Sequence, residues 1–178
     1  MDLRDLRPPA GGVLVMPMSR AEFDALPEIP HTEWWDGACV MTSNTNRHGR
    51  VVASLGAMLI HAIAGQELSV CAGTGWRLPD AEFGPDLLIT GPAPDDELLT
   101  IAPLLIVEVL SPSTRHIDLG RKRELYAIGG VGWYWIVDLV HDQLTVFRNV
   151  DGELEQVQHI SSGTTVGPVA IKVDVSAL

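Results

Sequence analysis

A short apolar run with one ionisable residue inside it limits most strongly how this chain can fold. Leu104 to Leu110 reads LLIVEVL, and Glu108 is its only charged side chain. A run of this length and β-branched content is typical of a strand that is buried on both faces of a sheet. A buried carboxylate is costly without a partner, so either a cation neutralises Glu108 or its pKa rises. The run therefore predicts a central strand and makes Glu108 the first functional candidate.

Length and composition predict a single soluble domain. The chain has 178 residues, of which 46% are hydrophobic and 20% charged, and this excludes a disordered or fibrous class. No apolar run approaches the roughly 20 residues of a membrane span, and the start, MDLRDLRPPAGG, lacks the apolar core of a signal peptide. We therefore expect a cytoplasmic protein with no membrane partner, and we expect Cys39 and Cys71 to be free buried thiols.

The charge balance restricts how the protein could hold nucleic acid. The formal net charge is −11 and the pI is about 4.8, which opposes binding through a broad basic surface. A cation site lined with carboxylates adds to such a balance. The acidic composition therefore constrains the binding mode more than the chemistry.

The N-terminal part of the chain divides into an arm and the start of a domain. Residues 1–18 are unpatterned and contain proline and glycine, so we expect a loose arm followed by one domain over residues 19–178. Ser19 and Glu22 fit a capping box that opens a short helix. Residues 33–42 predict a strand with a turn or bulge at Asp36 and Gly37, and residues 46–64 have the apolar spacing of an amphipathic helix.

The rest of the chain predicts strands around one further helix and a C-terminal β-hairpin. The hairpin turn is expected at Asp151-Gly152, a strong short turn signal. In chain order we expect a strand over 67–78, a loop over 79–85, a short strand over 86–90, a surface excursion over 91–103, the central strand, a helix over 118–128, and strands over 133–137, 143–150, 153–160 and 169–175. The fold class is α/β, with a mixed β-sheet flanked by α-helices.

Two carboxylates of this predicted sheet can meet at one place. Asp86 begins a strand directly after Pro85, and Glu108 lies in the next strand. If the two strands are neighbours, the pair with added water is sufficient to hold Mg²⁺ or Mn²⁺. A lysine at Leu110, on the same face as Glu108, would complete a familiar hydrolytic pattern. The long side chain of Lys122, on the following helix, can return an ammonium to that place.

Four ordered segments carry a resemblance to a known family. PDLLIT, LLIVEVLSPST, DLGRKRELYA and GVGWYWIVD resemble the Uma-type family of restriction endonuclease-like proteins in the PD-(D/E)XK nuclease superfamily, and EWWDGACVM is similar to its Glu-x-x-Asp-Gly strand. The resemblance implies a restriction-endonuclease-like fold with Asp86 and Glu108 as metal ligands. It also implies Lys122 as the catalytic lysine moved from strand to helix, and Glu33 as an additional catalytic carboxylate.

These residues predict a metal-dependent endonuclease that hydrolyses phosphodiester bonds of DNA. An ion held by Asp86 and Glu108 would polarise the phosphate and lower the pKa of a water, while Lys122 orients that water or stabilises negative charge. Arg121 to Arg123 would provide a local cationic patch. Two alternatives stay open: an inactive nuclease-fold protein that binds a partner or nucleic acid, and a hydrolase of smaller phosphoesters.

Each candidate residue also has a purely structural interpretation. Glu108 could pair with Arg77 or Arg115, Asp86 could cap a turn, and Lys122 could be a solvated helix residue. Apart from these, His48 could contact phosphate, although a structural histidine is the simpler interpretation. The mean hydropathy of +0.17 suggests exposed apolar positions and hence a homodimer, in which two sites would address two strands.

Overall fold

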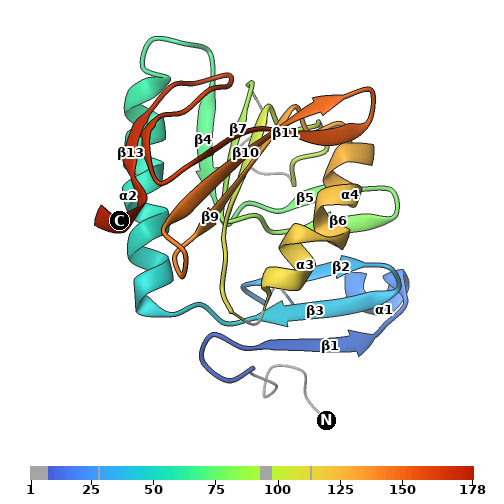
Figure 1. Cartoon of the computed structure of the whole chain (residues 1–178). Coiled ribbons are helices and arrows are strands. Elements are labelled where there is room, and N and C mark those ends of the chain that lie inside the picture. Colours follow the sequence, from blue (N-terminus) through green and yellow to red (C-terminus); the bar gives the residue numbers. More distant parts are fainter. Residues whose placement is uncertain (1–7, 28, 93–97, 113) are drawn as a thin grey trace.

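A six-stranded mixed sheet forms the centre of the molecule (Figure 1). The computed structural model describes residues 8–27, 29–92, 98–112 and 114–178. The strand order is β11-β10-β9-β8-β7-β4, and β8 runs parallel to β9 whereas the other neighbours are antiparallel. The expected central strand is β8, and all five of its residues are buried. The strands are β4 (Ser69–Ala72), β7 (Leu87–Thr90), β8 (Leu105–Val109), β9 (Trp133–Asp138), β10 (Gln143–Val150) and β11 (Glu153–Ile160).

Helix α2 (Asn46–Ala62) covers one face of this sheet, as the apolar spacing predicted. Thr45 caps the helix by accepting a hydrogen bond from the backbone N–H of His48. Val51, Leu55 and Leu59 are buried in the same apolar cluster as the inward side chains of β7, β8 and β9. This packing fixes the start of α2, and with it His48, against the sheet.

A second sheet of five antiparallel strands lies beside the first, in the order β1-β3-β2-β6-β5. Asp36 and Gly37 both have positive φ (51° and 72°), so the expected turn joins two strands into a tight hairpin. The prediction of a loop over residues 79–85 is wrong at its centre, because three of these residues pair with β5 and β2. The strands are β1 (Val13–Pro17), β2 (Thr32–Trp35), β3 (Ala38–Thr42), β5 (Trp76–Leu78) and β6 (Ala81–Phe83).

Part of the expected N-terminal arm belongs to this second sheet. Val13–Pro17 form β1 and pair with β3, so the prediction of a loose segment is wrong there; the rest of the arm up to residue 7 lies outside the described residues. Backbone pairing along an edge, which needs little side-chain pattern, explains why the sequence did not reveal the strand. Helix α1 (Arg20–Asp24) follows, and its predicted capping box between Ser19 and Glu22 is present.

The expected helix over residues 118–128 consists of two helices joined at a sharp break. They are α3 (Arg115–Leu119) and α4 (Arg121–Ile128), separated by Gly120 with φ −109° and ψ −102°. A Cβ on Gly120 would lie 2.9 Å from the carbonyl oxygen of His116, so glycine permits the break. Asp118 and Lys122 therefore lie on either side of a bend.

The C-terminal part contains the predicted hairpin and a small third sheet. Asp151 and Gly152 have positive φ and connect β10 to β11. The strand expected over 169–175 is shorter, with β13 (Lys172–Asp174) pairing with β12 (Ser162–Thr164) before a final 3₁₀ helix (Val175–Ala177). Within the described ranges both cysteines are free and no helix is long and apolar enough to cross a membrane.

Candidate active site

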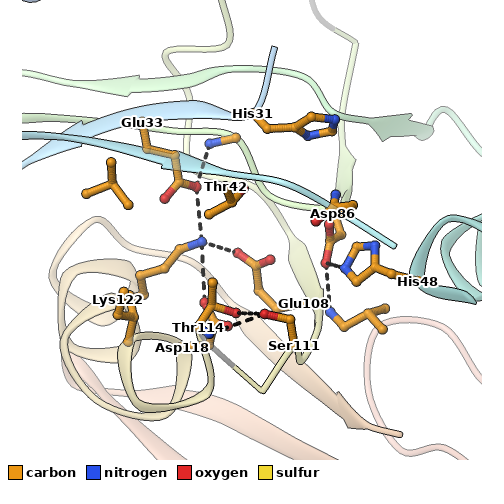
Figure 2. Close-up of a pocket in the computed structure, with 15 residues that line it drawn as sticks. His31, Glu33, Thr42, His48, Asp86, Glu108, Ser111, Thr114, Asp118 and Lys122 are labelled. Carbon is orange, nitrogen blue, oxygen red and sulfur yellow. Dashed lines mark hydrogen bonds and ion pairs between the residues drawn. The ribbon is translucent and has the colours of Figure 1, made fainter. Parts of the chain in front are cut away.

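A small pocket lies where β2, β3, β8 and the starts of three helices approach one another (Figure 2). Its volume is about 40 Å³, which is room for a few water molecules. All four residues expected at the active site, Glu33, Asp86, Glu108 and Lys122, line it. The fold therefore brings the four residues predicted from the sequence together in one pocket.

The register of β7 on β8 brings Asp86 and Glu108 to the same face of the sheet. Leu87 pairs with Val107 in this antiparallel ladder, so Asp86 precedes β7 at the position opposite Glu108. The Oδ2 atom of Asp86 accepts hydrogen bonds from the backbone N–H of Val109 at 2.8 Å and interacts with Nε2 of His48 at 3.1 Å. These contacts hold Asp86 at the end of β8, beside Glu108.

Lys122 reaches Glu108 from helix α4, as its long side chain predicted. Its Nζ donates hydrogen bonds to Oε1 of Glu108 at 2.6 Å and to Oε1 of Glu33 at 3.0 Å, and it lies 3.6 Å from Oδ1 of Asp118. The residue is only 5% exposed, so the interpretation of Lys122 as a solvated helix residue is wrong. Leu110 remains an apolar core residue of the neighbouring cluster.

The arginines considered as structural partners of Glu108 are paired elsewhere. Arg77 binds Glu82, and Arg115 binds Asp138. Glu108 is instead held by Lys122 and by the hydroxyl of Tyr126, which donates to its Oε1 at 2.7 Å.

Both oxygens of Glu33 are occupied by hydrogen bonds. Oε1 accepts from Lys122 and from the backbone N–H of Gly84 at 3.0 Å, and Oε2 accepts from the indole of Trp35 at 3.3 Å. The side chain is 6% exposed and comes from β2, in the second sheet. This arrangement suits Glu33 to position the lysine rather than to bind an ion.

Burial and charge shift the pKa values of the central groups. Burial raises the pKa of Glu108 well above its usual range, opposed by the ammonium of Lys122, and burial likewise raises the pKa of Asp118. For Lys122, burial lowers the pKa, but Glu108 and Glu33 outweigh it and the pKa lies well above its ordinary value. The lysine is therefore charged at neutral pH.

The donor set fits a hard divalent cation. Among the described residues that line the pocket there are four carboxylates and one ammonium, and the carboxylates of Glu33, Glu108 and Asp118 lie 2.6–3.6 Å from that ammonium, so acidic groups are in excess. Oδ2 of Asp86 and Oε1 of Glu108 make the hydrogen bonds given above. The other carboxylate oxygen of each residue, Oδ1 of Asp86 and Oε2 of Glu108, accepts none from the described residues. Carboxylate oxygens with added water are what Mg²⁺ prefers. No group of three or more His, Cys, Asp or Glu side chains in the described ranges has the geometry of a complete metal site, so water would have to supply the remaining ligands.

Comparison with known proteins adds a family to this geometry. The Uma2 family model, described as "Putative restriction endonuclease", matches residues 20–175. The chain belongs to the Uma2 family. A crystal structure of a putative nuclease belonging to DUF820, from Anabaena variabilis, has a TM-score of 0.72 with 19% sequence identity, over 85% of this chain and 90% of that one. At this identity the likeness concerns the fold, and it confirms the expected nuclease-like α/β architecture. No curated protein matches the sequence.

Three residues of this Uma2 site were not assigned from the sequence. Asp118 and Tyr126 flank Lys122 at a spacing of four residues on either side, and that helical spacing was the available signal. For His48, the sequence favours a structural role. It is buried beside Asp86, and its Nδ1 has no hydrogen-bond partner among the described residues.

The expected cationic patch at Arg121 to Arg123 does not form in this Uma2 protein. Arg121 donates to both carboxylate oxygens of Asp36, at 2.6 and 2.8 Å, and pairs with Glu124. Lys122 is buried, and the guanidinium of Arg123 lies over the ring of Phe147, 5.3 Å from its centroid. Carboxylates and an aromatic ring therefore engage the charges that were expected to face a phosphate.

Proposed function

We propose that this protein is a divalent-metal-dependent endonuclease that hydrolyses phosphodiester bonds of DNA. The observation that carries the proposal is the buried Lys122, hydrogen-bonded to Glu108 on the face of the sheet that also holds Asp86. Membership of the Uma2 family and the nuclease-like fold support it. Two carboxylates can hold a metal ion for phosphodiester hydrolysis, and a lysine beside them can stabilise the negative charge that develops.

The proposed roles follow from the contacts of each side chain. Asp86 and Glu108 would hold Mg²⁺ or Mn²⁺, which when bound polarises the phosphate and lowers the pKa of a water. Lys122 would donate a hydrogen bond to the attacking water or to the phosphoryl oxygens, where negative charge develops. Glu33 would position this lysine and Tyr126 would position Glu108, because each is hydrogen-bonded to that partner.

The cost of burying Lys122 favours a chemical role over a structural one. Apolar residues of similar volume often stabilise a protein as well as a buried ion pair does, because desolvation offsets the attraction. A cluster with an excess of carboxylates is less favourable still. An arrangement kept at this cost is consistent with a site that meets a cation and a phosphate.

A cleavage assay tests the proposal. The full chain is incubated with Mg²⁺, with Mn²⁺ and with EDTA on single- and double-stranded DNA and RNA, and Glu108→Gln serves as the inactive control. We expect cleavage of DNA that needs the metal and disappears in the variant. Equal products from parent and variant would show that the cleavage does not depend on Glu108 and would contradict the assignment of the site.

Two other functions are separated by the same assay. A hydrolase of smaller phosphoesters would leave all four nucleic acids intact but hydrolyse bis(p-nitrophenyl) phosphate in a metal-dependent way. A protein that only binds would cleave none of these substrates. The acidic surface, with a net charge of −11, is the observation that favours the binding alternative.

A further inference from the structure

A second, larger groove adjoins the catalytic pocket. Its volume is about 560 Å³, within the roughly 300–1,000 Å³ of sites that bind small organic groups. His31 and Gly84 line both the groove and the catalytic pocket, so the two spaces adjoin each other at these residues. A group in the groove would therefore lie next to one that reacts at Glu108.

Gly84 leaves open space where the two spaces adjoin, and we call this space the passage. A Cβ on Gly84 would meet no atom within 4 Å, so the absence of a side chain leaves free space there. His31, on the other side, is exposed and has a left-handed backbone with φ 58°, which is uncommon for a residue other than glycine. Its carbonyl oxygen accepts a hydrogen bond from the backbone N–H of Thr42 at 3.0 Å, and this bond anchors the backbone at His31.

The charged groups of the groove neutralise one another. Arg77 contacts Glu82 at 2.7 Å and Asp24 at 3.4 Å, and Arg20 contacts the same two carboxylates at 3.0 and 2.9 Å. Arg20 does not itself line the groove, and among the described lining residues Arg77 is paired with both Asp24 and Glu82, so its charge is not free for a phosphate to bind. The remaining lining includes the apolar side chains of Phe23, Leu26, Ile29 and Leu98.

Apolar side chains beside charges that are paired with one another suit a neutral heteroaromatic ring. A nucleobase has such a ring, with hydrogen-bonding groups at its edge, but in a duplex it is stacked and paired. The net charge of −11 also weakens binding to the dense phosphates of a duplex. Contact with an exposed base is then the available source of affinity.

We propose that this groove binds one unstacked base of single-stranded DNA, next to the phosphate held in the catalytic pocket. The preferred substrate class is then single strands and unpaired strand ends. The inference rests on the proposed nuclease function, because it places the scissile phosphate at Glu108 and Lys122.

Binding of a short fluorescein-labelled DNA oligonucleotide, followed by anisotropy, tests the inference. The unaltered protein is titrated in EDTA and again in Ca²⁺, with the single strand, with its duplex and with single strands carrying one abasic site at successive positions. We expect the single strand to bind at least about tenfold more tightly than the duplex. One abasic position should weaken binding roughly 5- to 100-fold, as expected for losing one base contact, and distant positions should change it little.

Matched substitutions locate the effect in the groove. Gly84→Leu fills the passage, whereas Gly91→Leu adds the same side chain at a glycine with equally open surroundings outside the groove. Leu98→Asp places a negative charge in the groove, whereas Ile101→Asp adds the same charge at an exposed apolar residue that does not line it. We expect about a tenfold loss of single-strand affinity for the first of each pair and less than a twofold change for the second, with unchanged circular dichroism.

The outcomes separate this inference from the proposed function. A flat abasic scan, equal affinity for duplex, no binding of the single strand in either buffer, or parental affinity in folded Gly84→Leu and Leu98→Asp variants would each overturn the groove assignment. Metal-dependent cleavage of duplex could still stand in those cases. A positive scan without cleavage under any metal would reject the nuclease and keep the base-binding groove.

Discussion

Lys122 shows how one buried charge depends on several distant residues. Its ammonium meets Glu108 from the central sheet, Glu33 from the second sheet and Asp118 from the preceding helix. Replacing it with alanine would leave buried carboxylates uncompensated and a cavity beside them, which typically costs about 3–5 kcal/mol. A methionine keeps most of the volume of the side chain and removes the ammonium with its hydrogen bonds, so it leaves a smaller cavity than alanine and is the better test of chemistry.

Lys122→Met should lower turnover by roughly 10²-fold or more, because a contact to the developing charge is lost while both proposed metal ligands remain. Glu108→Gln should lower both metal affinity and turnover, with partial recovery at high metal concentration. Single-turnover cleavage and metal titration, made well below the melting temperature of each variant, distinguish the two. If Lys122→Met cuts DNA at the parental rate where Glu108→Gln is inactive, the lysine has no catalytic role.

Asp138 should stabilise the folded protein at neutral pH, and this contribution should disappear in acid. Burial raises its pKa, but hydrogen bonds from Arg115 and His141 and from two backbone N–H groups outweigh burial and lower the pKa from 3.8 to about 2. A carboxylate with a lowered pKa in the folded state stabilises the protein above pH 3.8, and this contribution is lost as the pH falls to about 2.

The Asp138→Asn variant tests this linkage by thermal melting between pH 7 and pH 2. The parent should melt at a higher temperature than the variant at neutral pH, and the difference should shrink below pH 4. A difference that stays constant over this range would mean that the carboxylate contributes by shape or hydrogen bonding alone.

The sequence predicted the central residues of the site because each breaks a local pattern. Glu108 interrupts an apolar run, Asp86 follows Pro85 at a strand start, and Lys122 lies where a long side chain can return to the sheet. Asp118 and Tyr126 break no pattern on a polar helix, so their roles became visible only through their distances to Lys122 and Glu108.

The bend at Gly120 is the feature of secondary structure that most affects the site. Its φ and ψ of −109° and −102° lie outside the main regions allowed to residues with a Cβ. Asp118 precedes the bend and Lys122 follows it, yet both approach the same pocket. In a straight helix the side chains of Asp118 and Lys122 would have a different position and direction relative to each other.

Gly120→Ala should therefore destabilise the protein, by about 1–3 kcal/mol, and reduce cleavage. The control is Gly49→Ala, at a glycine inside α2 whose added Cβ would meet no atom within 4 Å. This substitution should stabilise by about 0.5–1 kcal/mol, as alanine normally does within a helix. Chemical denaturation of both variants measures the change in the free energy of unfolding and its sign. Stabilisation by Gly120→Ala would show that the bend is not required.

Secondary structure was predictable where local signals were strong. The apolar spacing of α2 and the Asp-Gly turns of both hairpins correspond to observed elements. Strands β1 and β6 were missed, because each is short and pairs with a strand distant in sequence, which β6 does in addition to its hairpin with β5. The division into two sheets depends on the same long-range pairing, which local patterns do not encode.

A homodimer remains a prediction for the whole molecule. Several large apolar side chains are well exposed, among them Ile128 at 76%, Val140 at 68% and Ile60 at 59%. Burying such residues against a second copy would remove apolar surface from water. Light scattering at micromolar concentration should give the mass of a dimer, and a monomer mass would refute the prediction.

Divalent cations should stabilise the folded protein through the proposed catalytic pocket. The pocket holds more carboxylates than cations, and burial raises the pKa of Glu108 and Asp118, so ionising these groups at neutral pH opposes folding. An ion that binds only the folded state adds about 2.7 kcal/mol to the free energy of unfolding when its concentration is 100 times its Kd. This gain corresponds to a rise of roughly 5–10 °C in Tm for a chain of this size. The unfolded chain has no assembled pair of ligands, so the gain should be specific to the native site.

Thermal melting of the parent with Mg²⁺, with Mn²⁺ and with NaCl at matched ionic strength separates binding from screening. In an acidic protein both salts screen repulsion, so the part of the shift that exceeds the NaCl shift is the relevant quantity. Asp86→Asn and Glu108→Gln should abolish this excess, whereas Asp151→Asn, at an exposed hairpin turn, should keep it. An equal excess in all three variants would place the cations on the general acidic surface and would remove Asp86 and Glu108 from the proposed metal site.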